Sequence, residues 1–291
     1  MSPESAEPND RLASADWPAA PAPLVSPVID THCHLDLIGQ QGGPDVDESV
    51  ELAAAAGVMR IVQVGTDVAS SRWAVGQARR KEAVLAAVAL HPNEAPRIHE
   101  RHGLDGLESA WAEIGQLAAD PEVVAIGETG MDFYRTDTPG RAVQEESFRR
   151  HIQIARETGK TLIVHDREAH EDALRILDDE PGPDRIVLHC FSGDAALVAE
   201  AARRGWFCSF AGVVTFKNAS VARQAAAAVP DELLLVETDA PFLTPTPHRG
   251  RVNGSYLMPL TVRALAEIRG TDEQGMCDLL MRNSRHAFAI E

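Results

Sequence analysis

Several features that mark other classes of protein are missing from this sequence. It has no run of about 18 apolar residues, so we expect no membrane-spanning helix. Its first 27 residues contain no basic start followed by an apolar core, so we expect no secretory signal. Only four cysteines occur, and none forms a Cys-x-x-Cys pair. This argues against a zinc knuckle and predicts reduced thiols in a cytoplasmic protein.

Basic residues are few compared with acidic ones. The chain has 27 Lys and Arg against 44 Asp and Glu, which gives a formal net charge of −17. Such an excess argues against broad, nonspecific binding of nucleic acid. It still allows a polyanionic substrate, because bound divalent ions can make a site locally positive inside an acidic protein.

The last absence bears on the fold. No G-x-G-x-x-G motif follows the first strand-like run, which removes the usual reason to prefer an open dinucleotide-binding sheet. Strand-like and helix-like segments instead alternate about eight times along 291 residues, as in a (β/α)₈ TIM barrel. We therefore predict an α/β fold in one domain, with strands near 27–31, 60–65, 84–90, 123–128, 161–165, 185–189, 206–210 and 233–238.

The chain is predicted to divide into a leader and a barrel. Residues 1–26 are rich in Pro, Ala and Ser and are expected to be flexible, whereas residues 27–291 form the barrel with two C-terminal helices on its exterior. Helices should end near glycines and begin at a capping side chain. The expected positions are Gly57, Gly159 and Gly205 for ends and Asp194 and Ser70 for starts. No long exposed apolar stripe stands out, so we expect a monomer.

Side chains that bind metals end five of the strand-like runs. They are His32 and His34, Glu128, His165, His189 and Asp239. In a parallel barrel the carboxyl ends of the strands converge on one face, where the chemistry takes place. The first two histidines are two residues apart, and such positions face the same side of a strand. We therefore expect all six side chains to meet.

Four histidines and two carboxylates are enough for two divalent ions if one carboxylate bridges them. Zinc and manganese accept this mixture of nitrogen and oxygen ligands. Magnesium prefers oxygen-rich sites, so the histidines count against it, although all three metals stay candidates. Two ions can activate a bridging water and stabilise the entering and leaving oxygens of a phosphoester, an amide or a lactone. The sequence therefore predicts a metal-dependent hydrolase.

Together, several segments resemble one family. The segments "IDTHCHLD", "GETGMDFYR", "VLHCFSGD" and "ETDAPFLTP" are similar to those of the TatD-type metal-dependent deoxyribonucleases, within the amidohydrolase-like barrel superfamily. The resemblance extends from Val28 to about Phe288. It implies a distorted TIM barrel, a two-metal site, and hydrolysis of DNA phosphodiesters from the 3′ end of single-stranded or damaged DNA.

The resemblance also implies roles for the ligands. One ion would be held by His32, His34, Glu128 and Asp239. Glu128 would bridge to a second ion held by His165 and His189. Asp239 would in addition act as general base or proton shuttle, so Asp239 and Glu128 are the expected catalytic residues.

Other residues are candidates for binding the substrate. His91 in "LHPNE" should face the barrel mouth and contact a phosphate. Arg249 and Arg251 follow the last strand, and Arg135 and Lys217 follow earlier ones, where guanidinium and ammonium groups could bind phosphates. Two departures from the family concern substrate preference: "RGRVNGS" lacks the usual Asn-Glu-Pro, and Asp166 replaces a common Ser.

Three further side chains are open to two interpretations each. Glu237 lies two residues before Asp239 and either orients a ligand or is a buried, paired acid. Phe133 and Tyr134 either stack on a base or pack at the barrel mouth.

Three functions remain open at this stage. The first is a 3′–5′ deoxyribonuclease. The second keeps the metal site but acts on an amide, lactone or phosphotriester, or on the ester of an aminoacyl-tRNA as a D-aminoacyl-tRNA deacylase. The third is a non-catalytic metal-binding protein. Amidohydrolases of the second kind often carry a carbamylated lysine on the fourth strand, where this chain has Glu128 and no lysine nearby. The complete ligand set argues against the third.

Overall fold

The computed structural model describes residues 17–290, and they form an eight-stranded parallel barrel. The strands follow one another in chain order around the sheet, so the predicted (β/α)₈ topology is confirmed. Most strand residues are apolar and buried, as in parallel strands covered by helices. The strands are β1 (Val28–Cys33), β2 (Val58–Val64), β3 (Val84–Val88), β4 (Val123–Asp132), β5 (Thr161–Arg167), β6 (Ile186–Leu188), β7 (Phe207–Phe210) and β8 (Leu234–Val236).

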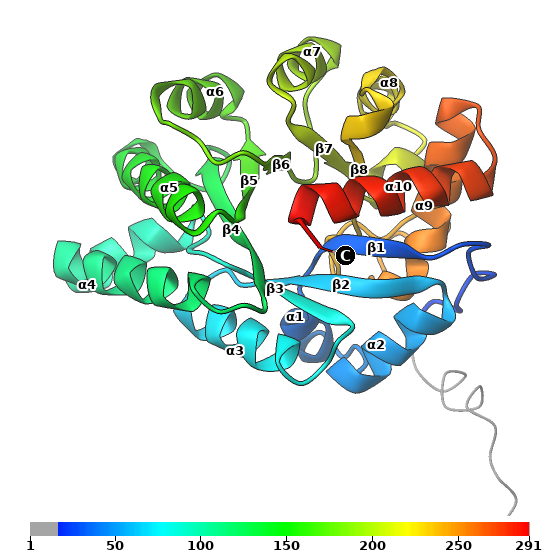
Figure 1. Cartoon of the computed structure of the whole chain (residues 1–291), viewed down its shortest axis with the longest axis horizontal. Helices are drawn as coiled ribbons and strands as arrows, with labels where there is room; N and C mark the ends of the chain where they lie inside the picture. The colour runs from blue at the N-terminus through cyan, green and yellow to red at the C-terminus, as the bar shows by residue number, and fades with distance from the viewer. Residues whose placement is uncertain (1–16, 291) are drawn as a thin grey trace, which may run out of the picture.

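Helices surround this sheet and fill the connections (Figure 1). The α-helices are α1 (Leu35–Gln40), α2 (Val46–Ala55), α3 (Val68–Ala78), α4 (Glu94–Ala118), α5 (Thr138–Thr158), α6 (His170–Asp179), α7 (Ala195–Arg204), α8 (Ser220–Ala228), α9 (Met258–Arg269) and α10 (Glu273–Phe288). The 3₁₀ turns are η2 (Gly212–Thr215), η3 (Asp231–Leu233) and η4 (Ser255–Leu257). Within residues 17–290, no helix has the length and apolar content needed to cross a bilayer.

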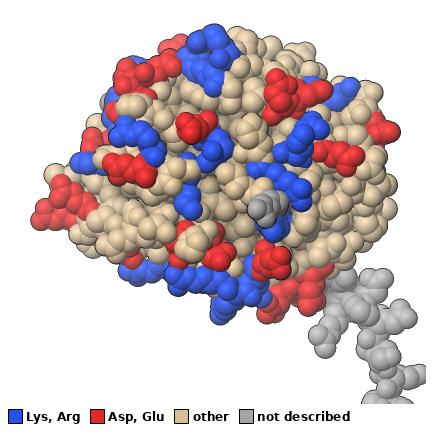
Figure 2. All heavy atoms as spheres, viewed as in Figure 1, with Lys and Arg blue, Asp and Glu red and all other residues tan. Residues whose placement is uncertain are grey.

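The two C-terminal helices lie outside the sheet of the barrel. The last helix, α10, packs against β1 and β8. The Thr161 hydroxyl at the start of β5 donates to the Ala287 carbonyl at 2.5 Å, so α10 ends at the amino-terminal side of the strands. Figure 2, drawn from the same side as Figure 1, shows acidic and basic side chains intermingled on this face. The negative charge of the chain is therefore not gathered into one patch there.

The barrel closes at a seam between β1 and the chain just after β8. No ladder joins these two strands, and the only bridge between them in the described part of the chain pairs Cys33 with Ala240. Two hydrogen bonds complete the seam. The Asp239 N–H donates to the His32 carbonyl at 2.9 Å, and the His34 N–H donates to the Ala240 carbonyl at 2.8 Å. The barrel is thus distorted at its closure, and three predicted ligands belong to that closure.

Helix ends follow the sequence in most places. Gly159 (φ 66°) and Gly205 (φ 71°) end α5 and α7 in the left-handed conformation, as predicted. Gly57 lies one residue beyond the cap of α2, with φ 93°. The prediction that Ser70 starts a helix is wrong, because Asp67 caps α3. Ser70 completes the cap from inside the helix: its N–H donates to the Asp67 carboxylate and its hydroxyl accepts from the Asp67 N–H.

Residues 17–26, which we assigned to the leader, lie against the barrel without helix or strand. Leu24 is buried in the core, and its N–H donates to the carboxyl end of α2 at 3.0 Å. The Pro18 carbonyl accepts a hydrogen bond from the Tyr256 hydroxyl at 3.0 Å. This stretch is therefore held by specific contacts. The rest of the expected leader, residues 1–16, lies outside the described residues.

Two glycines let β4 approach β5 very closely. A Cβ atom on Gly127 would lie 2.4 Å from the Cβ of Ile163, and one on Gly130 would lie 2.1 Å from the His165 carbonyl oxygen. Gly130 also has φ 138°, a conformation that other residues rarely adopt. Glu128 sits between these glycines, so the close approach carries its carboxylate to the end of β5.

We predict that Gly130→Ala lowers the free energy of unfolding by about 1–3 kcal/mol, the usual cost of overpacking a core. The added methyl group has only backbone to meet, so the strands must separate. Gly115→Ala is the matched control: it lies in α4 with open space around its Cβ position, and alanine favours a helix by up to about 1 kcal/mol. Urea unfolding of both variants checks this. Equal midpoints for the two would contradict it.

Candidate metal centre

The six predicted ligands meet at the carboxyl ends of the strands. One group of donor atoms combines His32, His34, Glu128 and Asp239. His34 Nε2 lies 3.4 Å from Glu128 Oε1 and 3.5 Å from Asp239 Oδ1. His32 Nε2 lies 3.3 Å from His34 Nε2 and 3.6 Å from Glu128 Oε1. Both histidines of the His-x-His pair therefore face the barrel axis, as their spacing predicts.

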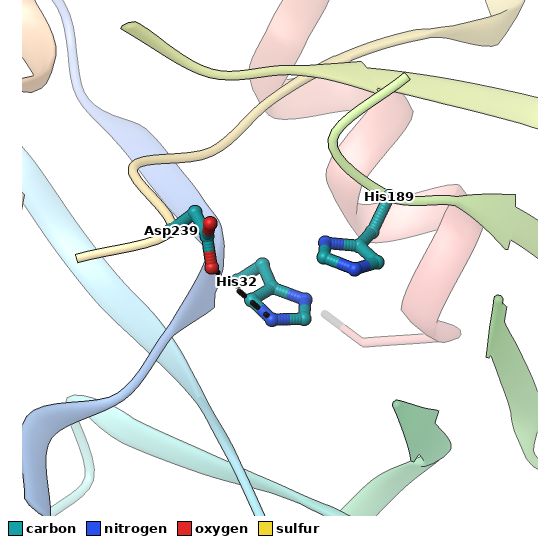
Figure 3. A group of neighbouring side chains, drawn as sticks. All are labelled: His32, His189 and Asp239. Carbon is teal, nitrogen blue, oxygen red and sulfur yellow. Dashed lines mark ion pairs between the residues drawn. The ribbon is translucent and has the colours of Figure 1, made fainter. Parts of the chain in front are cut away.

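A second group gathers around the other oxygen of Glu128. Oε2 of this residue lies 2.8 Å from His189 Nε2 and 2.9 Å from His165 Nδ1. His91 approaches the same oxygen, with its Nε2 at 3.7 Å. The ring of His189 also stacks on that of His32, with centroids 3.9 Å apart. Figure 3 shows these two rings and Asp239 converging from three separate segments of the chain.

Glu128 is common to both groups. One carboxylate oxygen faces the two histidines from β1, and the other faces the histidines after β5 and β6. Two triplets that share Glu128 each have donor atoms within 4.8 Å of one another: His32, His34 and Glu128, and His91, Glu128 and His165. Imidazole nitrogens and carboxylate oxygens at such spacing fit a divalent transition metal. The chemistry of the donor set therefore fits the metal that the sequence predicts.

Polar atoms behind the ligands hold the rings in place. His34 Nδ1 lies 3.2 Å from the Val64 carbonyl, to which it donates, so its Nε2 is directed at the cluster. His189 Nδ1 lies 3.4 Å from Glu237 Oε1, which also accepts the Cys190 N–H at 2.8 Å. Glu237 is fully buried. Glu237 is therefore a buried, paired acid, and its partner is the ring of the predicted ligand His189.

Asp132 is a residue that the sequence did not single out. It lies on β4, fully buried, with its Oδ2 atom 3.4 Å from His165 Nε2. The Asn93 side chain donates to the same oxygen at 3.0 Å, and the Arg135 N–H donates to Oδ1 at 2.9 Å. His165 is therefore held between two carboxylates, with Nδ1 toward Glu128. The motif "GETGMD" contains Asp132, but only the great length of β4 places its side chain at the cluster.

The cluster favours positive charge. Burial by itself would raise the pKa of the Glu128 carboxyl, but His91, His189 and His165 hold it well below its usual range. Burial by itself would lower the pKa of His34, yet its contacts with Asp239 and Glu128 raise it to about 10. Since ligands must lose their protons to bind a metal, cations and protons compete for these nitrogens.

His91 differs from His34, His165 and His189, whose pKa values are raised. Burial lowers its pKa to about 3, so the ring is neutral at physiological pH. Its Nδ1 accepts the Asn93 N–H at 3.0 Å, which leaves the ring proton on Nε2. That nitrogen lies 3.7 Å from Glu128 Oε2 and can donate a hydrogen bond.

A cavity of about 630 Å³ opens above the cluster. His91 lines it, as expected for a residue at the barrel mouth. Among the described residues, Arg249 and Arg251 do not line it, and the Arg249 guanidinium lies over the Phe216 ring, 4.0 Å from its centroid. Three other arginines do line it: Arg97, Arg135 and Arg167. Of the loop cations proposed from the sequence, Arg135 is therefore the one at the cavity.

We predict that Asp132→Asn weakens binding of a divalent ion on the order of 10- to 100-fold, because His165 loses the charged acceptor that orients it. Isothermal titration of the metal-stripped protein with zinc and with manganese measures this. Asp105→Asn, an exposed change on α4, is the control and should bind as the unmodified protein does. Unchanged affinity in Asp132→Asn would show that this carboxylate has no influence on the ligand.

Comparisons with known proteins agree with this arrangement. The sequence profile of the family described as "TatD related DNase" matches residues 29–289. A protein of Mycobacterium tuberculosis, named as an uncharacterized metal-dependent hydrolase TatD, is 43% identical over 270 residues, covering 90% of this chain and 98% of that protein. The "3'-5' ssDNA/RNA exonuclease TatD" of Salmonella typhimurium is 33% identical over 271 residues, covering 88% of this chain and 97% of its own.

A solved structure shows the same fold. The crystal structure of a TatD homologue from Escherichia coli K12 superposes with a TM-score of 0.82 at 27% identity, covering 91% of this chain and 98% of that one. The profile match extends over nearly the whole barrel, and the relatives are aligned over nearly their full length. The chain therefore belongs to the TatD family of metal-dependent hydrolases.

Proposed function

We propose that this hydrolase is a 3′–5′ deoxyribonuclease that removes nucleotides from single-stranded or damaged DNA with the help of two divalent ions. The observation that carries the proposal is the division of the Glu128 carboxylate between two groups of donor atoms. The name of the Salmonella relative, an exonuclease on single-stranded DNA and RNA, supports it. The three arginines of the cavity, which suit a polyanion, support it further.

Each ion has its own set of proposed ligands. His32, His34 and Asp239 would hold one, His165 and His189 the other, with Glu128 shared. When bound, two such ions lower the pKa of water and neutralise charge on a phosphodiester. The four histidines favour zinc or manganese over magnesium.

Asp239 is the proposed proton acceptor. It follows β8 with φ 50° and lines the cavity, and its side chain keeps 15% of its surface exposed. Burial by itself would raise the pKa of its carboxyl, but His34 and His32 hold it below its usual range. The carboxylate is therefore ionised at neutral pH and can take the proton of an attacking water.

His91 is proposed to bind the scissile phosphate. Its neutral ring carries a proton on Nε2, next to Glu128, and so offers a hydrogen bond to a phosphate oxygen. Arg249 and Arg251 lie in the loop after β8 and stay predicted contacts for a longer strand. Monomeric state and action in the cytoplasm likewise stay predictions.

Metal add-back tests the proposed function directly. Metal-stripped protein should release 3′ nucleotides from 3′-labelled single-stranded DNA after zinc, manganese or magnesium is returned, and should cleave bis-(p-nitrophenyl) phosphate in parallel. The double variant His32→Ala with His34→Ala should keep the circular dichroism of the barrel and lose both activities. Retained nuclease activity in a folded double variant would refute the metal assignment.

Asp239→Asn separates proton transfer from binding of the ions. The amide keeps an oxygen for the metal but accepts a proton poorly, so we predict that kcat falls at least about 100-fold, the lower end of what a general base contributes. Metal affinity, measured by the same titration as above, should change far less. A near-normal kcat would remove Asp239 from the chemistry.

A further inference from the structure

The cavity has two chemically different walls. On the side of β4 and β5, next to His165, it is lined by arginines. On the side of β1 and the loop after β8, next to His34, it is lined by Leu37, Phe242 and Leu243. The scissile bond lies between these walls if the ligands are where the proposed function places them. A substrate with two unlike ends would fit this asymmetry.

Phe242 is the main feature of the apolar wall. It keeps 45% of its surface exposed although it is a large apolar residue, and its ring centroid lies 6.2 Å from that of the ligand His34. Its position is fixed at both backbone atoms. The N–H donates to the Asp239 carbonyl at 2.9 Å, and the carbonyl accepts from the Asn253 side chain at 2.6 Å. The ring is thus presented to the cavity at a set place beside the metal ligands.

The opposite wall carries positively charged side chains that are not all paired with acidic ones. Arg97 is paired with Glu94, but the guanidinium groups of Arg135 and Arg167 make no ion pair with any residue between 17 and 290. Arg167 lies over the ring of Tyr134, 4.0 Å from its centroid. Tyr134 is 59% exposed, so it supports an arginine rather than packing in the core, which was one of its two interpretations.

We infer that Phe242 stacks on the base of the 3′-terminal nucleotide and that Arg135 and Arg167 bind phosphates of the remaining strand. The inference rests on the proposed nuclease function and sets the direction of the DNA in the site. The 3′-terminal nucleotide carries no phosphate on its 3′ hydroxyl. The apolar wall that contacts this nucleotide therefore needs no cation. Every nucleotide on the other side adds a phosphate, and that wall supplies cations. Because every base has an aromatic face, such stacking tolerates any sequence.

Removal of the terminal base tests the role of Phe242. The probe is a single-stranded oligonucleotide whose 3′-terminal residue is either a normal nucleotide or an abasic tetrahydrofuran. The unmodified enzyme should lose kcat/KM on the order of 10-fold on the abasic end, within the range of one base stacked on an aromatic ring. Phe242→Ala should lose a similar factor on the normal end and nothing further on the abasic end. Phe242→Trp should keep the discrimination.

The controls separate stacking from structure. Leu104→Ala changes another exposed apolar side chain, on α4 and outside the cavity lining, and should behave as the unmodified enzyme does. An equal loss for Phe242→Ala on both substrates would mean that the residue only positions its loop, and no loss on either would mean that it does not touch the base. Both results overturn the inference and leave the nuclease intact. Absence of cleavage of either DNA by the unmodified enzyme, with every metal, would refute the proposed function itself.

Strand length tests the charged wall. A dinucleotide has only the scissile phosphate, whereas longer oligonucleotides extend toward the arginines. The KM of the unmodified enzyme should fall as the strand is lengthened, and Arg135→Ala should remove several-fold of that gain without changing KM for the dinucleotide. An Arg135→Ala variant with an unchanged length dependence would overturn this part of the inference.

Discussion

A carboxylate buried at the centre of a barrel governs this structure. Glu128 is 3% exposed, and burying a lone carboxylate would cost several kcal/mol. The chain meets that cost by placing imidazoles around both of its oxygens. Three features bring these charged groups together. The glycines of β4 allow it to lie close to β5, the length of β4 places Asp132 at the cluster, and Asp132 holds His165 beside Glu128. Buried imidazoles and carboxylates arranged in this way suit cations, whether protons or metal ions.

The site and the closure of the barrel are the same piece of structure. Asp30 on β1 accepts the Thr238 N–H at 2.9 Å and the Ser255 hydroxyl at 2.7 Å, which ties the first strand to the chain after the last. Beside this tie, His32 and Asp239 are joined backbone to backbone. Since a one-residue slip would turn each predicted ligand away from the axis, the seam that shapes the barrel also fixes the positions of these side chains.

The sequence predicted what depends on strands and their ends. Apolar runs located all eight strands, and convergence of their carboxyl ends brought the six predicted ligands together. The features that the sequence did not predict depend on where strands end and on the paths of the loops between strands and helices. Asp132 reaches the cluster because β4 continues four residues past Glu128. The apolar pattern of the sequence does not predict this extension of the strand. The loop after β8 turns Phe242 inward and leaves Arg249 on the ring of Phe216, and loop paths are set by tertiary contacts such as those of Asn253. The prediction that Ser70 starts α3 was wrong because Asp67, in the same turn, also has a side chain that can cap a helix, and Asp67 takes the cap position.

The seam also joins parts of the chain that lie far apart in the sequence. Cys33 and Ala240 meet although 207 positions separate them, so their contact has one of the longest loop closures available to this chain. A ribosome-bound fragment that lacks the segment after β8 can form strands and helices but has neither a closed barrel nor a complete ligand set. The predicted site can therefore be completed only by a chain that already extends past β8.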